Sequence, residues 1–235
     1  MTSLGALSRG ALSRLRQAIW IALVIGVLVL IDSEYAIVIA ALVAIGIVAF
    51  ETRTPLRELG LSRPRSIVRT ILLGLAAGFV LLPFSKLLLT PVAEALTGIP
   101  RDLSGFDFVR GDVAAYLRLM PKIWIGAAIC EEIIFRGFLI GRLEAAFGGA
   151  SRAGTGAAIV LSSVVFGAAH AYQGPTGIII TAVLGLIFAI LFVASGRNLW
   201  ISIIAHGVYD TLSLALVLTS YDRVFNEIAH RLIPH

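Results

Sequence analysis

The sequence predicts an all-α membrane protein, a bundle of seven to eight transmembrane helices that forms a single domain over residues 1–235. The composition is 58% hydrophobic and only 14% charged, and the mean hydropathy is 0.96. A soluble domain of this size is much less apolar. The apolar residues also recur in long runs, and about 20 of them in a helix cross a bilayer core of about 30 Å.

Seven apolar runs are candidates for membrane spans. We expect helices near 15–31, 35–51, 67–89, 114–136, 155–173, 177–195 and 199–219. The segment 83–98 either extends the third span or folds back as a short interfacial helix, which would be the eighth element. The pairs Gly74/Gly78 and Gly137/Gly141 are each four residues apart, so each predicts a small helix face where a neighbour can approach closely.

Basic residues predict how the bundle is oriented. The net charge is +5, and the arginines cluster before the first span, between the second and third, and after the fourth. The positive-inside rule places these loops and the N-terminus in the cytoplasm. Because the basic residues lie in short loops and form no aromatic-rich basic face, we expect a bilayer and no nucleic acid as the partner.

Other features of the sequence concern its location. The first apolar run resembles a signal peptide, but no small-x-small cleavage pattern follows it, so we expect a retained span. The single cysteine, Cys130, excludes an internal disulfide. Of the 19 basic residues only Lys86 and Lys122 are lysines, which indicates a GC-rich prokaryotic genome and hence the plasma membrane of a prokaryote.

Ionisable residues interrupt three of the apolar spans. A charged side chain at mid-membrane costs about 2.5–3.5 kcal/mol by insertion scales, so each needs a partner or a function. The interrupting residues are Glu131, Glu132 and Arg136 in the fourth span, His170 in the fifth, and His206 and Asp210 in the seventh.

The spacing of the residues in the fourth span predicts different roles for the two glutamates. In an α-helix Glu132 and Arg136 share a face and can neutralise each other as a structural ion pair. Glu131 points about 100° away, because successive residues of an α-helix are rotated by that angle. It must therefore find its partners on other spans, and a carboxylate in an apolar cavity suits a general base.

The two histidines predict a polar site between helices. His206 and Asp210 are four residues apart, so the aspartate can hold one imidazole nitrogen, as in many catalytic and metal sites. His170 has only Tyr172 and Gln173 as polar neighbours and should face the other helices. We expect His170 to lie level with Glu131 if its helix continues to about Gln173.

These residues form three motifs that occur in order. They are Glu131-Glu132-x3-Arg136, Phe166-x3-His170 and His206-x3-Asp210. In them the chain resembles the CPBP family of CAAX-processing and bacteriocin-processing membrane peptidases, whose motifs are E-E-x3-R, F-x3-H and H-x3-N/D. The resemblance covers roughly residues 115–215, which would be the catalytic core.

The resemblance implies an intramembrane endopeptidase that cleaves a membrane-associated protein or peptide. Glu131 and His170 would activate a water, and His206 and Asp210 would stabilise the oxyanion. An ionised aspartate only accepts hydrogen bonds, so Asp210 must either be protonated or act through His206.

The resemblance leaves the need for a metal open. Members of the family are often described as metallopeptidases, and Glu131, His170 and His206 with one water would form a Zn²⁺ site. No H-E-x-x-H motif occurs, however, and the resemblance equally supports a glutamate mechanism without a cofactor, which we favour.

Two other functions are alternatives. Buried Glu, His and Asp also line the paths of proton- or ion-coupled transporters, but the sequence shows neither inverted repeats nor paired broken helices. A non-catalytic family member that acts in immunity or as a scaffold is the other alternative, and the intact motif residues argue against it.

Overall fold

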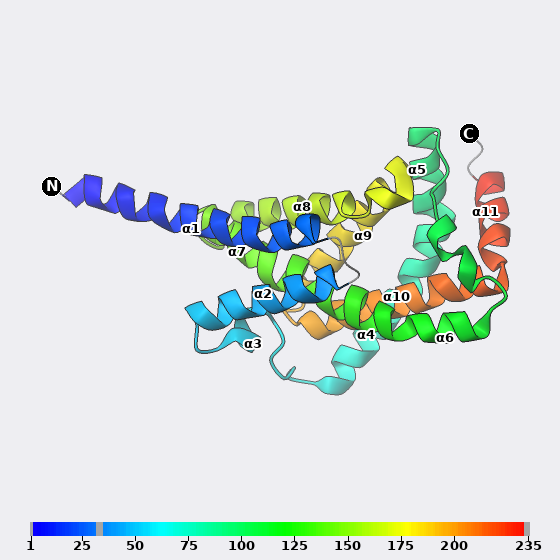
Figure 1. The fold of residues 1–235 in the computed structure, drawn as a ribbon, viewed down its shortest axis with the longest axis horizontal. Coiled ribbons are helices and arrows are strands. Elements are labelled where there is room, and N and C mark those ends of the chain that lie inside the picture. The colour runs from blue at the N-terminus through cyan, green and yellow to red at the C-terminus, as the bar shows by residue number, and fades with distance from the viewer. Residues whose placement is uncertain (1, 32–34, 233–235) are drawn as a thin grey trace.

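A computed structural model describes residues 2–31 and 35–232. Within these residues every regular element is helical and no strand occurs (Figure 1). The first half contains α1 (Thr2–Leu30), α2 (Ala36–Glu51), α3 (Pro55–Glu58), α4 (Ile67–Phe84), η1 (Ser85–Leu89), α5 (Thr90–Thr97) and η2 (Ser104–Val109). The second half contains α6 (Val113–Lys122), η3 (Ile123–Leu139), α7 (Ile140–Ala146), α8 (Arg152–Ala168), η4 (Ala171–Gln173), α9 (Gly174–Ala194), α10 (Leu199–Thr219) and α11 (Tyr221–Leu232).

Four helices are long and apolar enough to cross a membrane, judged by length and composition. They are Gly10–Leu30, Ile67–Thr97, Ala171–Ala194 and Leu199–Thr219, and α2 and α8 are shorter apolar helices. The all-α membrane fold is therefore confirmed, while the predicted count of seven to eight spans is not. The 16 residues of α2 and the 17 of α8 extend only about 24–26 Å at 1.5 Å per residue, less than a bilayer core of about 30 Å.

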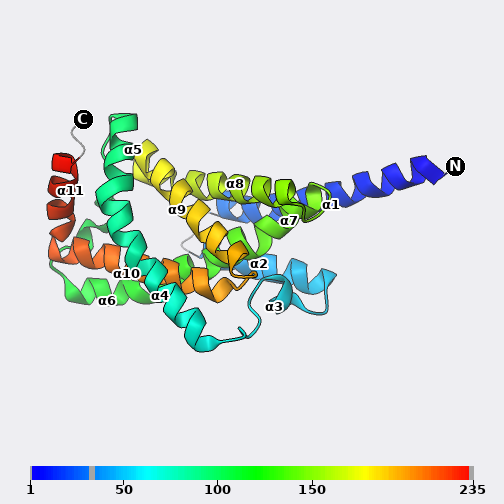
Figure 2. The ribbon, with the colours of Figure 1, turned by 180° about the vertical axis from the view of Figure 1, so that it is seen from behind.

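The segment 83–98 extends the third predicted span and does not fold back. From Ile67 to Thr97 the chain is one helix that changes direction between α4 and α5 (Figure 2). Pro83 lies inside α4 and the wider π-helical turn η1 follows it directly. Both features interrupt the regular hydrogen-bond ladder, which explains the change of direction.

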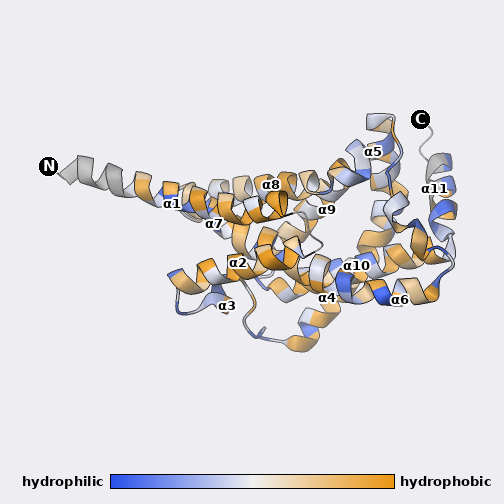
Figure 3. Ribbon diagram, in the orientation of Figure 1, coloured by the Kyte–Doolittle hydropathy of each residue, from blue (hydrophilic) through white to orange (hydrophobic). Residues whose placement is uncertain are grey.

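Large apolar side chains cover much of the outside of the bundle. Hydrophobic residues follow the long helices over most of their length, and hydrophilic ones gather in the loop after α3 and on α11 (Figure 3). Leu72, Phe79 and Val80 on α4 are each more than half exposed. Such a surface is unfavourable in water but suits lipid chains, so the protein is an integral membrane protein.

Glycines allow α4 to approach α10 closely. A Cβ atom built at Gly74 would lie 2.6 Å from Cβ of Ile204, and one at Gly78 would lie 2.7 Å from Cβ of Val208. The predicted small face at this pair is therefore confirmed. A Cβ at Gly137 would meet the Leu59 carbonyl oxygen at 2.9 Å, so this glycine also marks a close approach.

The second predicted glycine pair is only half correct. Nothing lies within 4 Å of a Cβ atom built at Gly141, so the prediction of a close neighbour there was wrong. The spacing of two glycines fixes which helix face they share, whereas a second element must lie along the whole face for both to be in contact.

The helix that contains the predicted acid motif differs from the α-helix assumed from spacing. The predicted span 114–136 consists of three consecutive segments, α6, η3 and α7, and η3 is π-helical from Ile123 to Leu139. It packs against α2, α8, α9 and α10. A π-helix has more residues per turn than an α-helix, so the predicted angle of about 100° between Glu131 and Glu132 does not apply.

Candidate active site

Glu131 points into a small cavity inside the bundle. The cavity has a volume of about 120 Å³ and is lined by all four predicted catalytic residues, Glu131, His170, His206 and Asp210. One water molecule occupies about 30 Å³ in the liquid, so the cavity has room for water beside these side chains. The Oε2 atom of Glu131 is buried and has no hydrogen-bond partner among the described residues.

His170 reaches this cavity because the chain stays coiled after α8. The helix ends at Ala168, and the 3-10 turn η4 continues to Gln173. The Nδ1 atom of His170 lies 2.8 Å from the Phe166 carbonyl oxygen, which can only accept a hydrogen bond. In this arrangement Nδ1 carries the hydrogen, and Nε2 keeps a lone pair if the ring is neutral.

His206 lies between two carboxylates. Its Nδ1 is 2.9 Å from Oε1 of Glu132, and its Nε2 is 3.4 Å from Oδ2 of Asp210. An ionised carboxylate only accepts hydrogen bonds, so both ring nitrogens carry hydrogens when both acids are ionised, and the ring is then cationic. Its face stacks on Phe188, with ring centroids 4.8 Å apart.

Arg136 supports this arrangement from below the cavity. Its Nη1 lies 2.8 Å from the same Oε1 of Glu132 that faces His206, and both residues of the pair are fully buried. Nη2 donates to the Gly185 carbonyl oxygen at 3.2 Å, and the guanidinium lies 4.3 Å from the centroid of the Phe166 ring. Glu132 therefore bridges a buried cation and the histidine.

Sequence reasoning missed the contact between Glu132 and His206. The fourth span holds two acids but only one base, so one negative charge had to be compensated by another helix, and this imbalance was the available signal. The spacing assigned Glu132 wholly to Arg136, because contacts between helices leave no trace in the spacing along one of them.

Sequence reasoning also missed Arg101, which lines the same cavity. Its Nε and Nη2 atoms donate to Oε1 of Gln173 at 2.9 and 2.6 Å. The side chain of Tyr209 lines the cavity too, and its hydroxyl is 2.9 Å from Oγ of Ser85. Arg101 lies in a polar connection between helices, a type of segment in which sequence alone rarely distinguishes a site residue from a solvated one.

The predicted zinc ligands do not form a ligand cluster here. Among the described residues no group of three or more His, Cys, Asp and Glu side chains is arranged to hold a metal ion. Glu131, His170 and His206 line one cavity, but both nitrogens of His206 face carboxylates and Nδ1 of His170 is bonded to the backbone. The donor set therefore does not fit zinc in this arrangement.

A helical membrane bundle that encloses a carboxylate, two histidines and space for water belongs to a class of membrane proteins built for polar chemistry inside the bilayer. Residues 114–212, which contain all three motifs, match the family model described as type II CAAX prenyl endopeptidase Rce1-like. The predicted resemblance is confirmed, and through this segment the chain belongs to the CPBP/CAAX protease family. No curated protein and no solved structure matches the chain.

Proposed function

We propose that the protein is an intramembrane endopeptidase that hydrolyses a peptide bond of a membrane-associated protein or peptide. Family membership implies a protease. The observation that best supports the assignment of the site is the unpartnered Oε2 of Glu131, which faces a cavity shared with His170, His206 and Asp210. A buried carboxylate oxygen without a partner is unfavourable unless a substrate or water uses it.

Glu131 acts as the general base in this proposal. A water in the cavity donates one hydrogen to Glu131, and His170 orients the water by accepting its second hydrogen at Nε2. The water oxygen forms a bond to the scissile carbonyl carbon, and the carbonyl oxygen becomes an oxyanion. When the C–N bond breaks, Glu131 returns its proton to the leaving amine, so protons and electrons balance.

His206 is the donor to the oxyanion. Its Nε2–H faces Asp210 across a contact of 3.4 Å, which is longer than a strong charge-assisted hydrogen bond. This N–H is therefore available to the developing negative charge. Asp210 orients the ring and does not bind the oxyanion itself, which resolves the choice that the sequence left open in favour of action through His206.

No metal takes part in the proposed reaction. Glu131 and His170 supply the acceptors for the water, and His206, held between Glu132 and Asp210, supplies positive charge near the oxyanion. Electrostatic stabilisation by fixed donors in a cavity shielded from water is commonly the largest contribution to catalysis.

The proposed placement in the membrane follows the arginine distribution. The N-terminus and the loops rich in arginine face the cytoplasm of a prokaryote, and the shorter helices α2 and α8 cross the bilayer together with the four long helices and the segment from α6 to α7. This gives the seven spans expected from the apolar runs.

Cleavage of a membrane-tethered peptide library tests the proposal. The purified protein, its Glu131→Gln variant and a Glu58→Gln control are compared with and without a strong chelator. Glu58 is exposed on α3, so its substitution removes the same charge outside the cavity. We expect cleavage by the intact protein and the control, with or without chelator, and a loss of at least about 100-fold in the Glu131 variant.

Other outcomes would reject parts of the proposal. Loss of cleavage in chelator that added zinc restores would show that a metal is required. Full activity of the Glu131→Gln variant would exclude this residue as the base. No cleavage by the intact protein of any library member would favour the transporter or scaffold alternative.

A further inference from the structure

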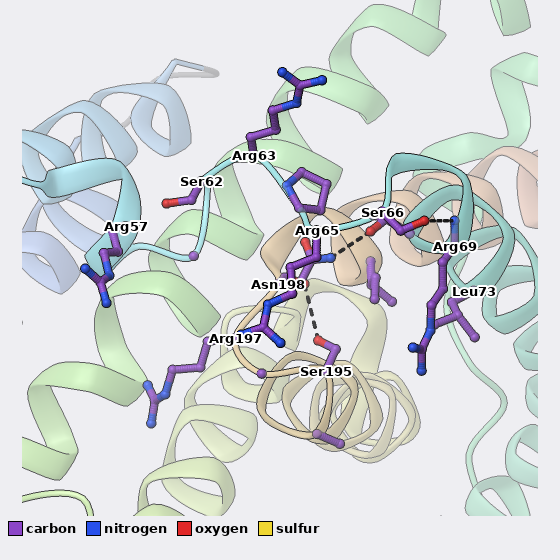
Figure 4. Close-up of a pocket in the computed structure, with 16 residues that line it drawn as sticks. Arg57, Ser62, Arg63, Arg65, Ser66, Arg69, Leu73, Ser195, Arg197 and Asn198 are labelled. Carbon is purple, nitrogen blue, oxygen red and sulfur yellow. Dashed lines mark hydrogen bonds between the residues drawn. The ribbon is translucent and has the colours of Figure 1, made fainter.

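A second, larger cavity lies at the arginine-rich end of the bundle. Its volume is about 710 Å³, and it shares no lining residue with the candidate active site. Its walls are the loop between α3 and α4, the first turns of α4, and the turn that joins α9 to α10 (Figure 4). Five arginines line it, and no carboxylate does: Arg57, Arg63, Arg65, Arg69 and Arg197.

Most of this positive charge is uncompensated. Arg197 is paired with Glu144, whose carboxylate oxygens lie 2.6 and 2.8 Å from Nη2. The other four arginines have no acidic side chain within ion-pair distance in the described part of the chain. Like charges around one cavity repel each other, and an anion bound between them would relieve the repulsion.

Two helix N-termini add to the positive potential. Ser66 caps α4 and Asn198 caps α10, and both residues line the cavity. The first amides of a helix bear a partial positive charge and favour anions. The helix α9 ends in the same turn, but the Phe192 carbonyl oxygen near its end already accepts from Oγ of Ser195 and from the Arg197 amide, both at 2.9 Å.

Apolar side chains lie directly beside the arginines. Ile67 and Val68, in the first turn of α4, are 49% and 67% exposed, and Leu72 one turn later is 60% exposed. Trp200, in the first turn of α10, is 36% exposed and donates its indole N–H to the Leu61 carbonyl oxygen at 3.2 Å. Tryptophan with a polar tip and an apolar body is typical of the membrane interface.

We propose that this cavity binds the headgroup of an anionic phospholipid. The phosphodiester lies against Arg65, Arg69 and the first amides of α4, and the acyl chains run along the exposed apolar side chains of α4. Basic pockets between helices at a membrane surface bind anionic headgroups in this way. The general excess of arginine in cytoplasmic loops accounts for the sign of the charge, but not for a walled cavity between two helix N-termini.

A lipid is favoured over a soluble anion because the cavity opens beside lipid-facing helix surfaces. A soluble phosphate would use the arginines and amides alone and would gain nothing from Ile67, Val68 and Leu72. The proposal concerns a site outside the catalytic cavity, and it does not depend on the proposed peptidase activity.

Binding of short-chain lipids to the purified protein tests this site. Fluorescent dioctanoyl phosphatidylglycerol and dioctanoyl phosphatidylcholine are titrated with the protein in an uncharged detergent, and fluorescence anisotropy is measured. The variant R65Q/R69Q removes two arginines of the cavity, and R53Q/R152Q removes two arginines that do not line it. All four side chains are exposed, so the substitutions leave the core intact, and thermal melting checks that both variants remain folded.

The proposal has a definite signature. The intact protein and R53Q/R152Q should bind phosphatidylglycerol at least about tenfold more tightly than phosphatidylcholine, and R65Q/R69Q should lose this preference. Equal weakening in the two double variants would overturn the site in favour of a diffuse charged surface. Equal affinity of the intact protein for both lipids would overturn it too, and displacement by millimolar inorganic phosphate as effective as by unlabelled lipid would replace the lipid with a soluble anion.

Discussion

Glu131 and Glu132 are adjacent in the chain, but their surroundings predict opposite effects on stability when their charges are removed. Glu132 faces Arg136 at 2.8 Å and His206 at 2.9 Å, and it is fully buried. Glu131 has a buried Oε2 without a partner. The substitutions Glu132→Gln and Glu131→Gln keep nearly the same shape and remove one negative charge each, so they isolate the effect of the charge.

Glu132→Gln leaves two buried cationic groups without their shared carboxylate. Removal of one partner from a buried pair typically costs about 3–5 kcal/mol. At about 2–4 °C per kcal/mol for a chain of this length, the midpoint of thermal unfolding should fall by roughly 6–20 °C. Glu131→Gln removes a desolvated charge that has no partner, so the midpoint should stay within about 4 °C of the intact protein or rise.

Thermal unfolding in one detergent, followed by circular dichroism and by size-exclusion recovery after heating, measures both variants together. Peptide cleavage is measured on the same samples below the lower midpoint. We expect Glu131→Gln to be stable and inactive, and Glu132→Gln to be destabilised. Equal midpoints for the two variants would refute the assignment of Glu132 as the bridge and of Glu131 as the unpartnered acid.

Two further predictions concern packing and pH. Gly207→Ala should cost about 1–3 kcal/mol, because its Cβ would lie 2.6 Å from the Trp124 ring, whereas Gly141→Ala, with nothing within 4 Å, should be neutral or slightly stabilising in thermal unfolding; equal losses would contradict this contrast. Burial opposes the charge of Asp222, but hydrogen bonds from Arg110 lower the pKa of its carboxyl below the usual 3.8. Its stabilising contribution is therefore complete above about pH 4 and is lost as the pH falls through the lowered pKa. Asp222→Asn should remove that acid-dependent part of the stability curve, and an unchanged curve would exclude the ion pair as its source.

Much of the fold could be predicted from the sequence because hydropathy is a local property. Each of the seven apolar runs overlaps a helix, and the family was identified from three short motifs between Glu131 and Asp210. The close face at Gly74 and Gly78 was also predictable, because two small residues four apart lie on the same side of a helix.

The number of spans was less predictable from the sequence. Hydropathy identifies apolar segments, but α2 and α8 prove shorter than a bilayer core. The segment from α6 to α7 holds the ionisable residues of the fourth span together with the bases that flank them, which lowers its hydropathy. Whether such helices cross the membrane depends on how their neighbours shield them.

The sequence by itself determined that the chain is a helical membrane protein of the CPBP/CAAX protease family, and which residues are its candidate acids and histidines. Only the tertiary structure decided which charges meet. Glu132 bonds to His206 from another helix, Glu131 is left facing the cavity without a partner, and Arg101 enters from a connecting loop. The physical reason is that hydropathy and spacing act along one helix, whereas the partner of a buried charge is set by how the helices pack around it.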